Sequence, residues 1–287
     1  MNHRQKHFSA CLIALAALLS VGPIQGAWAA TAPALNTASN FAVLGGAGVT
    51  CTDSTITGAA GSLLTVSPTA TCTITGPIHA GDAAATAAYS DFLLAYDELA
   101  TANPCPTDAA HNLSGDLGGM TLSPGVYCIS GTGLLTSKLT LNGPSNGVWV
   151  FKAATDFTPI GGSVVMAGGG QACNVYWQTG TAVSLDATQF LGNILAGSAV
   201  TFTGVGSSLV GRALAKTAVT MTGASVIGCD VLPVPGTPPG SSTCKDKHHD
   251  GHDGDHDDDH DDGHDKDKEH KSQHNPFGSN DKHGDKK

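Results

Sequence analysis

Three short phrases of the sequence repeat one pattern at almost even intervals. Each consists of a small hydroxyl residue, alanine, valine, a second hydroxyl residue and a bulky apolar residue: TAVSL begins at Thr181, SAVTF at Ser198 and TAVTM at Thr217. Glycine corners divide the surrounding chain into the units 174–192, 193–211 and 212–228, each with three strand-sized segments. A period of about twenty residues predicts stacked coils, and three strands per coil predict a β-solenoid of roughly triangular section.

The alternation within each phrase predicts which side chains face the core. Successive side chains of a strand point to opposite faces, so the valine and the bulky residue of one phrase share a face, and the hydroxyl between them points the other way. Stacked coils would set these hydroxyls about 4.8 Å apart, which predicts a flat grid. We expect Val183, Leu185, Val200, Phe202, Val219 and Met221 inside, Ser184, Thr201, Thr220, Thr203 and Thr222 outside, and Asp186 in the outer row of the first coil.

One segment, Gly81 to Ala102, departs from the solenoid pattern. Asp82 is a good N-cap residue, and Tyr89, Phe92, Leu93, Tyr96 and Leu99 recur at helical spacing. We therefore predict one long amphipathic α-helix packed against a solenoid face through its aromatic stripe. The prolines that follow at Pro104 and Pro106 end it.

The two ends of the chain differ in composition from the body. Residues 1–30 combine early basic residues, a short apolar run and the small-x-small pattern of Ala27 and Ala29, which predicts a signal peptide. We expect the mature product to be secreted, in the medium, in a periplasm or at a cell surface, with residues 31–230 as the solenoid domain. Residues 231–244 read as a Pro/Gly linker and residues 245–287 as a disordered His/Asp-rich tail.

The tail interleaves histidines with carboxylates, a composition able to coordinate divalent metals. A loose chain offers no fixed geometry, so we expect weak, unselective metal binding and no required cofactor; a solvated acidic tether is an equal alternative. The candidate ligands are His248, His249, His252, His256, His260 and His264.

Cysteine usage fits an exported protein held by disulfides. Seven cysteines follow the signal peptide, none in a C-x-x-C pair. We favour bonds between neighbours that bracket local loops or close the last coils: Cys51 with Cys72, Cys105 with Cys128, and Cys173 with Cys229. Other pairings remain open on spacing alone, and Cys244 is left over.

Charge and motifs argue against several function classes. Between Thr31 and Cys244 there are ten acidic and four basic residues, so no basic patch exists for nucleic acid. The apolar run of the leader is too short to span a bilayer, and no later segment replaces it. Outside the leader and the tail the histidines are His79 and His111, and neither lies in a nucleophile motif, which argues against an enzyme.

Several phrases in fixed order resemble the DUF3494 family of ice-binding proteins over nearly all of residues 35–230. They include LNTASNFAVLGGAGVT at Leu35, DLGGMTLSPGVYCIS at Asp116, ACNVYWQTGTAVSL at Ala172 and VGRALAKTAVTM at Val210. The resemblance implies a discontinuous right-handed β-helix, with coils not stacked strictly in chain order and one long helix alongside. It also implies ice as the partner, bound through a flat face. We expect the protein to be a monomer.

The family associates a T-A/G-x-T/N motif with its ice-binding surface. Residues 217–220 fit the motif fully, residues 181–184 and 198–201 fit it with one Ser-for-Thr exchange each, and Thr37 begins a further match at 37–40 that we interpret as a strand entry. The competing hypothesis is a surface adhesin that uses the solenoid as a rigid scaffold. The candidate ice-binding residues are Thr181, Ser184, Ser198, Thr201, Thr203, Thr217, Thr220 and Thr222.

Overall fold

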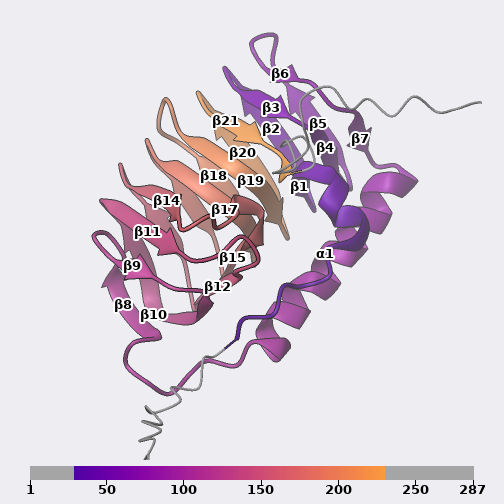
Figure 1. Ribbon diagram of the computed structural model, residues 1–287. Coiled ribbons are helices and arrows are strands. Elements are labelled where there is room, and N and C mark those ends of the chain that lie inside the picture. Colours follow the sequence, from indigo (N-terminus) through magenta and orange to yellow (C-terminus); the bar gives the residue numbers. More distant parts are fainter. Residues whose placement is uncertain (1–28, 230–287) are drawn as a thin grey trace, which may run out of the picture. The chain divides into compact units, whose positions relative to one another are not determined.

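The computed structural model describes residues 29–229, which form a mostly β, discontinuous right-handed β-helix with one long α-helix alongside (Figure 1). The predicted signal peptide up to residue 28, the linker (231–244) and the tail (245–287) lie outside the described residues. The strands pair in parallel throughout and build three faces, which confirms the predicted triangular solenoid.

The first face lies under the helix and is called the helix-covered face. Its central strands are buried on both sides, as expected for a parallel sheet covered by a helix, whereas the two end strands are mostly exposed. In spatial order they are β8 (Asn112–Asp116), β10 (Gly125–Leu135), β12 (Trp149–Ala153), β15 (Val175–Thr179), β17 (Gln189–Ala196), β19 (Ser208–Ala215), β1 (Phe41–Gly45), β4 (Ala59–Ser62) and β7 (Ile78–Ala80).

The second face carries the outward hydroxyls and is called the hydroxyl face. It begins with the last residues of β10 and continues through β13 (Phe157–Pro159), β16 (Val183–Leu185), β18 (Val200–Phe202), β20 (Ala218–Thr222), β2 (Gly48–Thr52) and β5 (Thr65–Pro68). Each strand of a face is one rung.

The third face completes the triangle. It runs from β9 (Thr121–Leu122) through β11 (Lys138–Asn142), β14 (Ser163–Ala167), the first residues of β17 and of β19, β21 (Ser225–Ile227), β3 (Thr55–Thr57) and β6 (Thr73–Ile74).

At two corners the chain bends inside a continuous strand. β17 and β19 each continue from the third face onto the helix-covered face, with Gly192 and Gly211 at the bend. Both glycines have positive φ, 111° and 150°, and a Cβ on Gly211 would lie 2.0 Å from the carbonyl oxygen of Gly192. Glycine is therefore needed where neighbouring coils turn together.

The stacking order is not the chain order, as the family resemblance implied. The first coils of the chain stack on the last ones, because β1 pairs with β19 and β2 with β20. α1 (Ala83–Ala102) then carries the chain back to the opposite end of the stack. A helix of that length spans about 30 Å, close to the roughly 34 Å between β7 and β10 at a rung spacing of about 4.8 Å.

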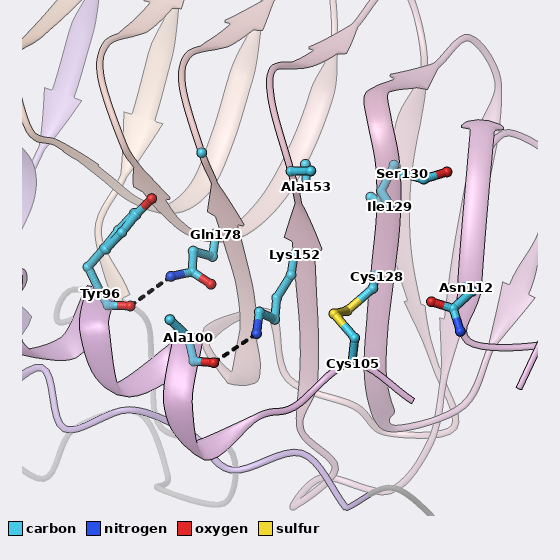
Figure 2. Close-up of a pocket in the computed structure, with 12 residues that line it drawn as sticks. Tyr96, Ala100, Cys105, Asn112, Cys128, Ile129, Ser130, Lys152, Ala153 and Gln178 are labelled. Atoms are coloured by element: carbon cyan, nitrogen blue, oxygen red, sulfur yellow. Dashed lines mark hydrogen bonds between the residues drawn. A yellow bond between two sulfur atoms is a disulfide. The ribbon is translucent and has the colours of Figure 1, made fainter. Parts of the chain in front are cut away.

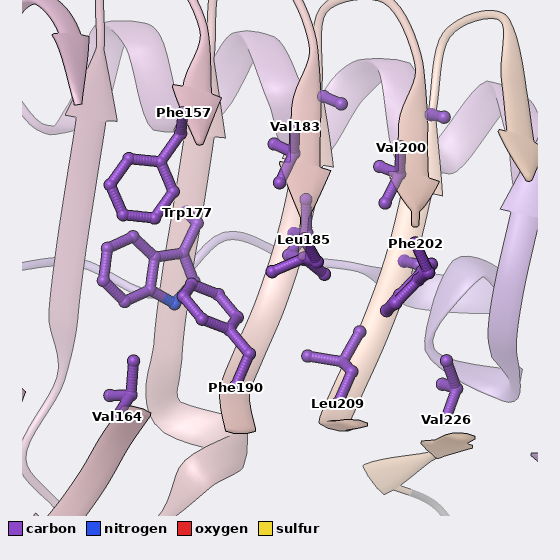
Figure 3. Packing of buried hydrophobic residues seen from close by; sticks show 14 of the residues in the cluster. Phe157, Val164, Trp177, Val183, Leu185, Phe190, Val200, Phe202, Leu209 and Val226 are labelled. Atoms are coloured by element: carbon purple, nitrogen blue, oxygen red, sulfur yellow. The ribbon is translucent and has the colours of Figure 1, made fainter. Parts of the chain in front are cut away.

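The interior is filled by the residues predicted to face inward. The valines and bulky residues of the three repeated phrases are fully buried, and Figure 3 shows Val183, Leu185, Val200 and Phe202 in successive rungs. Toward the other end of the stack, Trp177 stacks on Phe151 with ring centroids 3.9 Å apart. Aliphatic and aromatic side chains together fill the core along the solenoid axis.

A second core cluster lies between the helix-covered face and α1. Phe92 and Leu99 are fully buried there, and Tyr89, Leu93 and Tyr96 pack against the same cluster, which confirms the predicted stripe. Asp82 caps the helix, because its carboxylate accepts a hydrogen bond from the Ala85 amide at 2.8 Å.

The structure contains three disulfides: Cys51–Cys72, Cys105–Cys128 and Cys173–Cys229. These are the pairs favoured from the sequence. Cys244 lies outside the described residues.

The motif match that begins at Thr37, interpreted as a strand entry, leads directly into β1. Residues Asn36–Asn40 form a short 3-10 helix, η1, that packs on α1. Both the amide and the hydroxyl of Thr37 donate to the Asp91 carboxylate. The motif match at 37–40 is thus explained by helix packing and lies away from the hydroxyl face.

Candidate functional site

The hydroxyl face presents a row of small hydroxyl side chains along its middle. Parallel register places Ser184 beside Thr201, Thr201 beside Thr220, Thr220 beside Thr50, and Thr50 beside Ser67. Their side chains point away from the core, because the residues on either side of each point inward. Thr220, Thr50 and Ser67 are exposed, and Ser184 and Thr201 are half-buried.

A second row follows two residues further along each strand. Thr222 pairs with Thr52, and the amide of Thr203 bonds to the Leu185 carbonyl at 2.9 Å, which keeps Thr203 in register with Asp186. Thr69 continues the row, since its amide donates to the Cys51 carbonyl at 2.8 Å. On the other side of the middle row lie the small residues Ala199, Ala218 and Gly48, and then Thr65.

The hydroxyls of the middle row are available to solvent. Among the described residues, those of Ser184, Thr201, Thr220, Thr50 and Ser67 form no hydrogen bond with protein atoms. The rotamers of the three threonines are nonetheless restricted, because Thr is β-branched, and the parallel ladder holds the backbone beneath all five residues. The face can therefore hold water molecules at positions set by the rung spacing.

The eight residues predicted as the site fall into two groups. Ser184, Thr201, Thr220, Thr203 and Thr222 lie in the two rows. Thr181, Ser198 and Thr217 instead stack at the corner that precedes these strands, with the Thr181 carbonyl accepting from the Ser198 amide at 2.8 Å and the Ser198 carbonyl accepting from the Thr217 amide at 2.9 Å. The Thr181 hydroxyl is occupied, because it donates to Asp156.

The rows also contain residues that the sequence analysis missed. Thr50, Thr52, Ser67 and Thr69 join them because β2 and β5 stack beyond β20. The segments GVTCT and TVSPT show the same alternation as the repeated phrases. That signal was present, but only the crossed coil order shows that these strands share the hydroxyl face.

The rows lose their regularity toward β10. Beyond Ser184 the middle row continues with Thr158 and then Leu134. The second row continues from Asp186 to Ile160, which is 48% exposed. The uncharged region, which we call the hydroxyl grid, therefore consists of the outward residues of β18, β20, β2 and β5 and of residues that directly flank these strands. Its members are Ala199, Thr201, Thr203, Ala218, Thr220, Thr222, Gly48, Thr50, Thr52, Thr65, Ser67 and Thr69.

Carboxylates on the same side of the solenoid hold the backbone at its corners. The Thr181 hydroxyl and the Ala182 amide bond to Asp156 and lower the pKa of that carboxyl. Thr136 and the Gly118 amide lower the pKa of Asp116 in the same way. Both groups are thus ionised at neutral pH, and both lie outside the hydroxyl grid.

A cavity of about 420 Å³ lies on the helix-covered face (Figure 2). Its walls include the Cys105–Cys128 disulfide. The Lys152 ammonium donates to the carbonyls of Ala100 and Asn103 at 3.0 and 2.8 Å, which caps the end of α1. Burial lowers the pKa of Lys152. Both hydrogen bonds join this side chain of β12 to the end of α1.

The remaining site expectations concern metals and membranes. Within residues 29–229 there is no group of three or more His, Cys, Asp or Glu side chains that could hold a metal ion. His79 and His111 pair with Asp82 and Asp108, each at 2.7 Å. The candidate metal ligands His248, His249, His252, His256, His260 and His264 lie outside the described residues. Across the described range, no helix is both long and apolar enough to cross a bilayer.

Comparison with known proteins gives consistent matches. A family model described as "Ice-binding-like" matches residues 29–227. An ice-binding protein of Nostoc sp. (strain HG1) is 41% identical over 184 residues, which cover 61% of this chain and 66% of that protein, just under two thirds of its length. An ice-binding protein of Flavobacterium frigoris (strain PS1) is 35% identical over 200 residues, covering 62% of this chain and 70% of that protein.

Solved structures match the same region. The crystal structure of an ice-binding protein from the Antarctic ascomycete Antarctomyces psychrotrophicus superposes with a TM-score of 0.63 at 30% identity. The superposition covers 69% of this chain and 98% of that one. The matched proteins named here are ice-binding proteins and none is an enzyme, in agreement with the sequence analysis.

Proposed function

This chain belongs to the ice-binding-like family, and from that premise we propose that it adsorbs to ice through the hydroxyl grid and inhibits ice growth and recrystallisation. The observation that carries the proposal is the register of Thr201, Thr220, Thr50 and Ser67 on four neighbouring rungs. These side chains are solvent-accessible, uncharged and free of protein hydrogen bonds.

The physical basis is an ordered layer of water. Hydroxyls bond water and threonine methyls limit where that water can sit, so a rigid array can hold water in positions compatible with a growing crystal. Each contact is weak. Because the face is rigid, little conformational entropy is lost on adsorption, and many contacts form together. Adsorbed protein would then block growth steps at the ice surface.

The boundary of the grid follows from the same argument. Asp186 introduces a strongly hydrated carboxylate in the second row, and Ile160 and Leu134 replace hydroxyls beyond it. Water held by these residues cannot follow the spacing of the threonine rungs. We therefore place the site on β18, β20, β2 and β5, with Ser184 at its margin and with Thr181, Ser198 and Thr217 at its edge.

Export, oligomeric state and tail chemistry complete the proposal. We propose that residues 1–30 direct secretion and are removed, since three disulfides suit an oxidising compartment. The protein would act as a monomer without a cofactor, because adsorption needs only the one face. Weak metal binding by the tail (245–287) is a separate proposal. The adhesin hypothesis has no support among the matched proteins, which are named for ice binding.

A pair of substitutions in one coil tests the assignment. Thr50 lies on the hydroxyl face and Thr55 is an exposed residue on the third face. We expect Thr50→Tyr to reduce thermal hysteresis and recrystallisation inhibition by about ten-fold or more, because a bulky ring lifts the face away from the crystal. Thr55→Tyr should leave both unchanged. Melting temperatures should be similar for the two variants.

Substitutions in β18 and β20, which form the C-terminal part of the grid, give an independent check. Thr201→Tyr and Thr220→Tyr should reduce activity as Thr50→Tyr does, although these residues lie 151 and 170 positions away from Thr50 in sequence. Full activity in all three variants would disprove the proposed site. Loss only in Thr201→Tyr and Thr220→Tyr would restrict the site to the C-terminal rungs.

A further inference from the structure

The last rung of the hydroxyl grid, β5, is held differently from the other three. Within the described residues β5 pairs only with β2, so it is an edge strand. In β18, β20 and β2 both inward side chains are fully buried, whereas in β5 Val66 is half-buried and Pro68 is exposed. Packing therefore stabilises this rung much less, and edge strands with few apolar contacts open locally at low cost.

A disulfide lies directly beneath this weakly packed rung. Cys51 of β2 occupies the inward column between Met221 and Pro68 and is 0% exposed. It bonds to Cys72, which is partly buried against the main core. Cys72 belongs to the turn that follows β5, so the bond ties the end of the last rung to the interior of the preceding one.

Hydrogen bonds within the turn connect the disulfide to the surface residue Thr69. The Thr69 amide donates to the Cys51 carbonyl at 2.8 Å, and the Cys72 amide donates to the Thr69 carbonyl at 3.0 Å. The Thr71 hydroxyl accepts from the Asp53 amide at 3.2 Å and lies 3.0 Å from the Thr69 hydroxyl. Thr69, the second-row residue of this rung, is thus fixed through residues that directly adjoin the disulfide.

We propose that Cys51 and Cys72 are positioning residues of the ice-binding site, whose disulfide keeps Thr65, Ser67 and Thr69 level with the other rungs of the hydroxyl grid. The inference rests on the proposed function. A face that binds by many weak simultaneous contacts loses affinity when one rung becomes mobile, because that rung must then be ordered on adsorption. The disulfide limits this cost by restricting the loop that it closes.

The chain provides a matched control. Cys105–Cys128 closes a loop of similar length, with a sequence separation of 23 against 21. It joins the segment after α1 to β10 at the opposite end of the stack, at the cavity on the helix-covered face. Its removal should lower stability by a comparable mechanism while leaving the hydroxyl grid intact.

The experiment compares two double variants of the full chain. We expect Cys51→Ala with Cys72→Ala to lower thermal hysteresis by about two-fold or more at temperatures where the protein is folded. Cys105→Ala with Cys128→Ala should keep the full activity, although both melting temperatures fall. Amide hydrogen exchange should accelerate within residues 65–72 only in the first variant. Full activity in the first variant, or an equal loss in both, would overturn the inference.

A milder variant covers the case in which the first double variant does not fold. Thr71→Val keeps the disulfide but removes the hydroxyl that bonds the Asp53 amide, so we expect a smaller loss of activity with nearly unchanged melting. Full activity of Thr71→Val would then count against the inference. The substitution Thr50→Tyr distinguishes the proposed ice-binding site from the positioning role of the disulfide. If Thr50→Tyr abolishes activity while the disulfide variants do not, the site stands and only the positioning role fails.

Discussion

The helix-covered face and the hydroxyl face use the same parallel ladder but differ in their outward residues. On the helix-covered face the outward positions include Leu44, Val150 and Leu214, which are fully buried against α1. On the hydroxyl face the outward positions include Thr50 and Thr220, which stay exposed. The comparison shows that the inward residues build the solenoid, while the outward residues decide whether a face binds a helix or water.

The difference also separates stability from function. The outward apolar side chains of the helix-covered face each contribute about 1.5–3 kcal/mol on full burial, so that face stabilises the fold. A hydroxyl exposed to water contributes little to folding, so the grid is free to be selected for what it contacts. Substitutions on the two faces should therefore have opposite profiles of stability and activity.

The largest expected stability effect lies on the helix-covered face. Phe92 of α1 is fully buried in the second core cluster, and Phe92→Ala should cost about 3–5 kcal/mol of unfolding free energy because it leaves a cavity. Chemical denaturation measures this loss. Near 0 °C the fraction of Phe92→Ala molecules that remains folded should keep its ice activity.

Leu94 provides the control for this substitution on the same helix. It is 64% exposed, so Leu94→Ala should change the unfolding free energy by no more than about 0.5 kcal/mol. A fall in ice activity that exceeds the unfolded fraction of Phe92→Ala would break the separation between the two faces.

An intermediate effect is expected on acidification. The Ala85 amide and His79 lower the pKa of Asp82, and Thr37 lowers the pKa of Asp91. A carboxyl with a lowered folded-state pKa contributes stability above its unfolded pKa near 3.8, and that contribution disappears as pH falls through the folded value. Both groups hold α1 or its packing partner η1, so acid should loosen the helix-covered face.

The measurement is the melting temperature between pH 7 and pH 2, with the helical circular-dichroism signal followed separately. Asp91→Asn should show a smaller acid-dependent decrease than the unsubstituted protein, because one of the contributing carboxylates is absent. An identical decrease in both proteins would show that the contact between Asp91 and Thr37 contributes nothing to the acid response.

The smallest effect is expected at the margin of the hydroxyl grid. Asp186 lies beside Thr203 in the second row, and Asp186→Thr should extend the row by one rung. We expect thermal hysteresis to increase by no more than about two-fold, since a single rung is added to a proposed binding face that already has several. Asp186→Asn is the control, because it removes the charge without supplying a threonine. A decrease in Asp186→Thr would indicate that the carboxylate itself contacts ice-like water.

Much of the architecture was predictable because its causes are local. The alternation in TAVTM assigns Val219 and Met221 to the core, and the spacing of Phe92 and Leu99 identifies the face of the helix that packs inward. Both predictions are confirmed. The match at Thr37 shows that a four-residue motif carries no information on which element a residue joins, because there η1 packs on α1 and leads into β1.

The site could be predicted only in part. Ser184, Thr201, Thr220, Thr203 and Thr222 come from coils that are consecutive in both sequence and space, so their register follows from the repeat. Thr50, Thr52, Ser67 and Thr69 are separated from them by the helix and by more than a hundred residues. No periodicity connects segments across such an insertion.

By itself, the sequence determined the repeating coil, the inward and outward sides of each strand, and the single amphipathic helix, because these depend on side-chain alternation and spacing within short segments. Only the tertiary structure decided that the first coils stack upon the last, that α1 lies over one face and leaves the hydroxyl face open, and that a disulfide lies under the edge rung. The physical reason is that these features arise from contacts between distant segments, where burial and backbone pairing choose a partner that local pattern cannot identify.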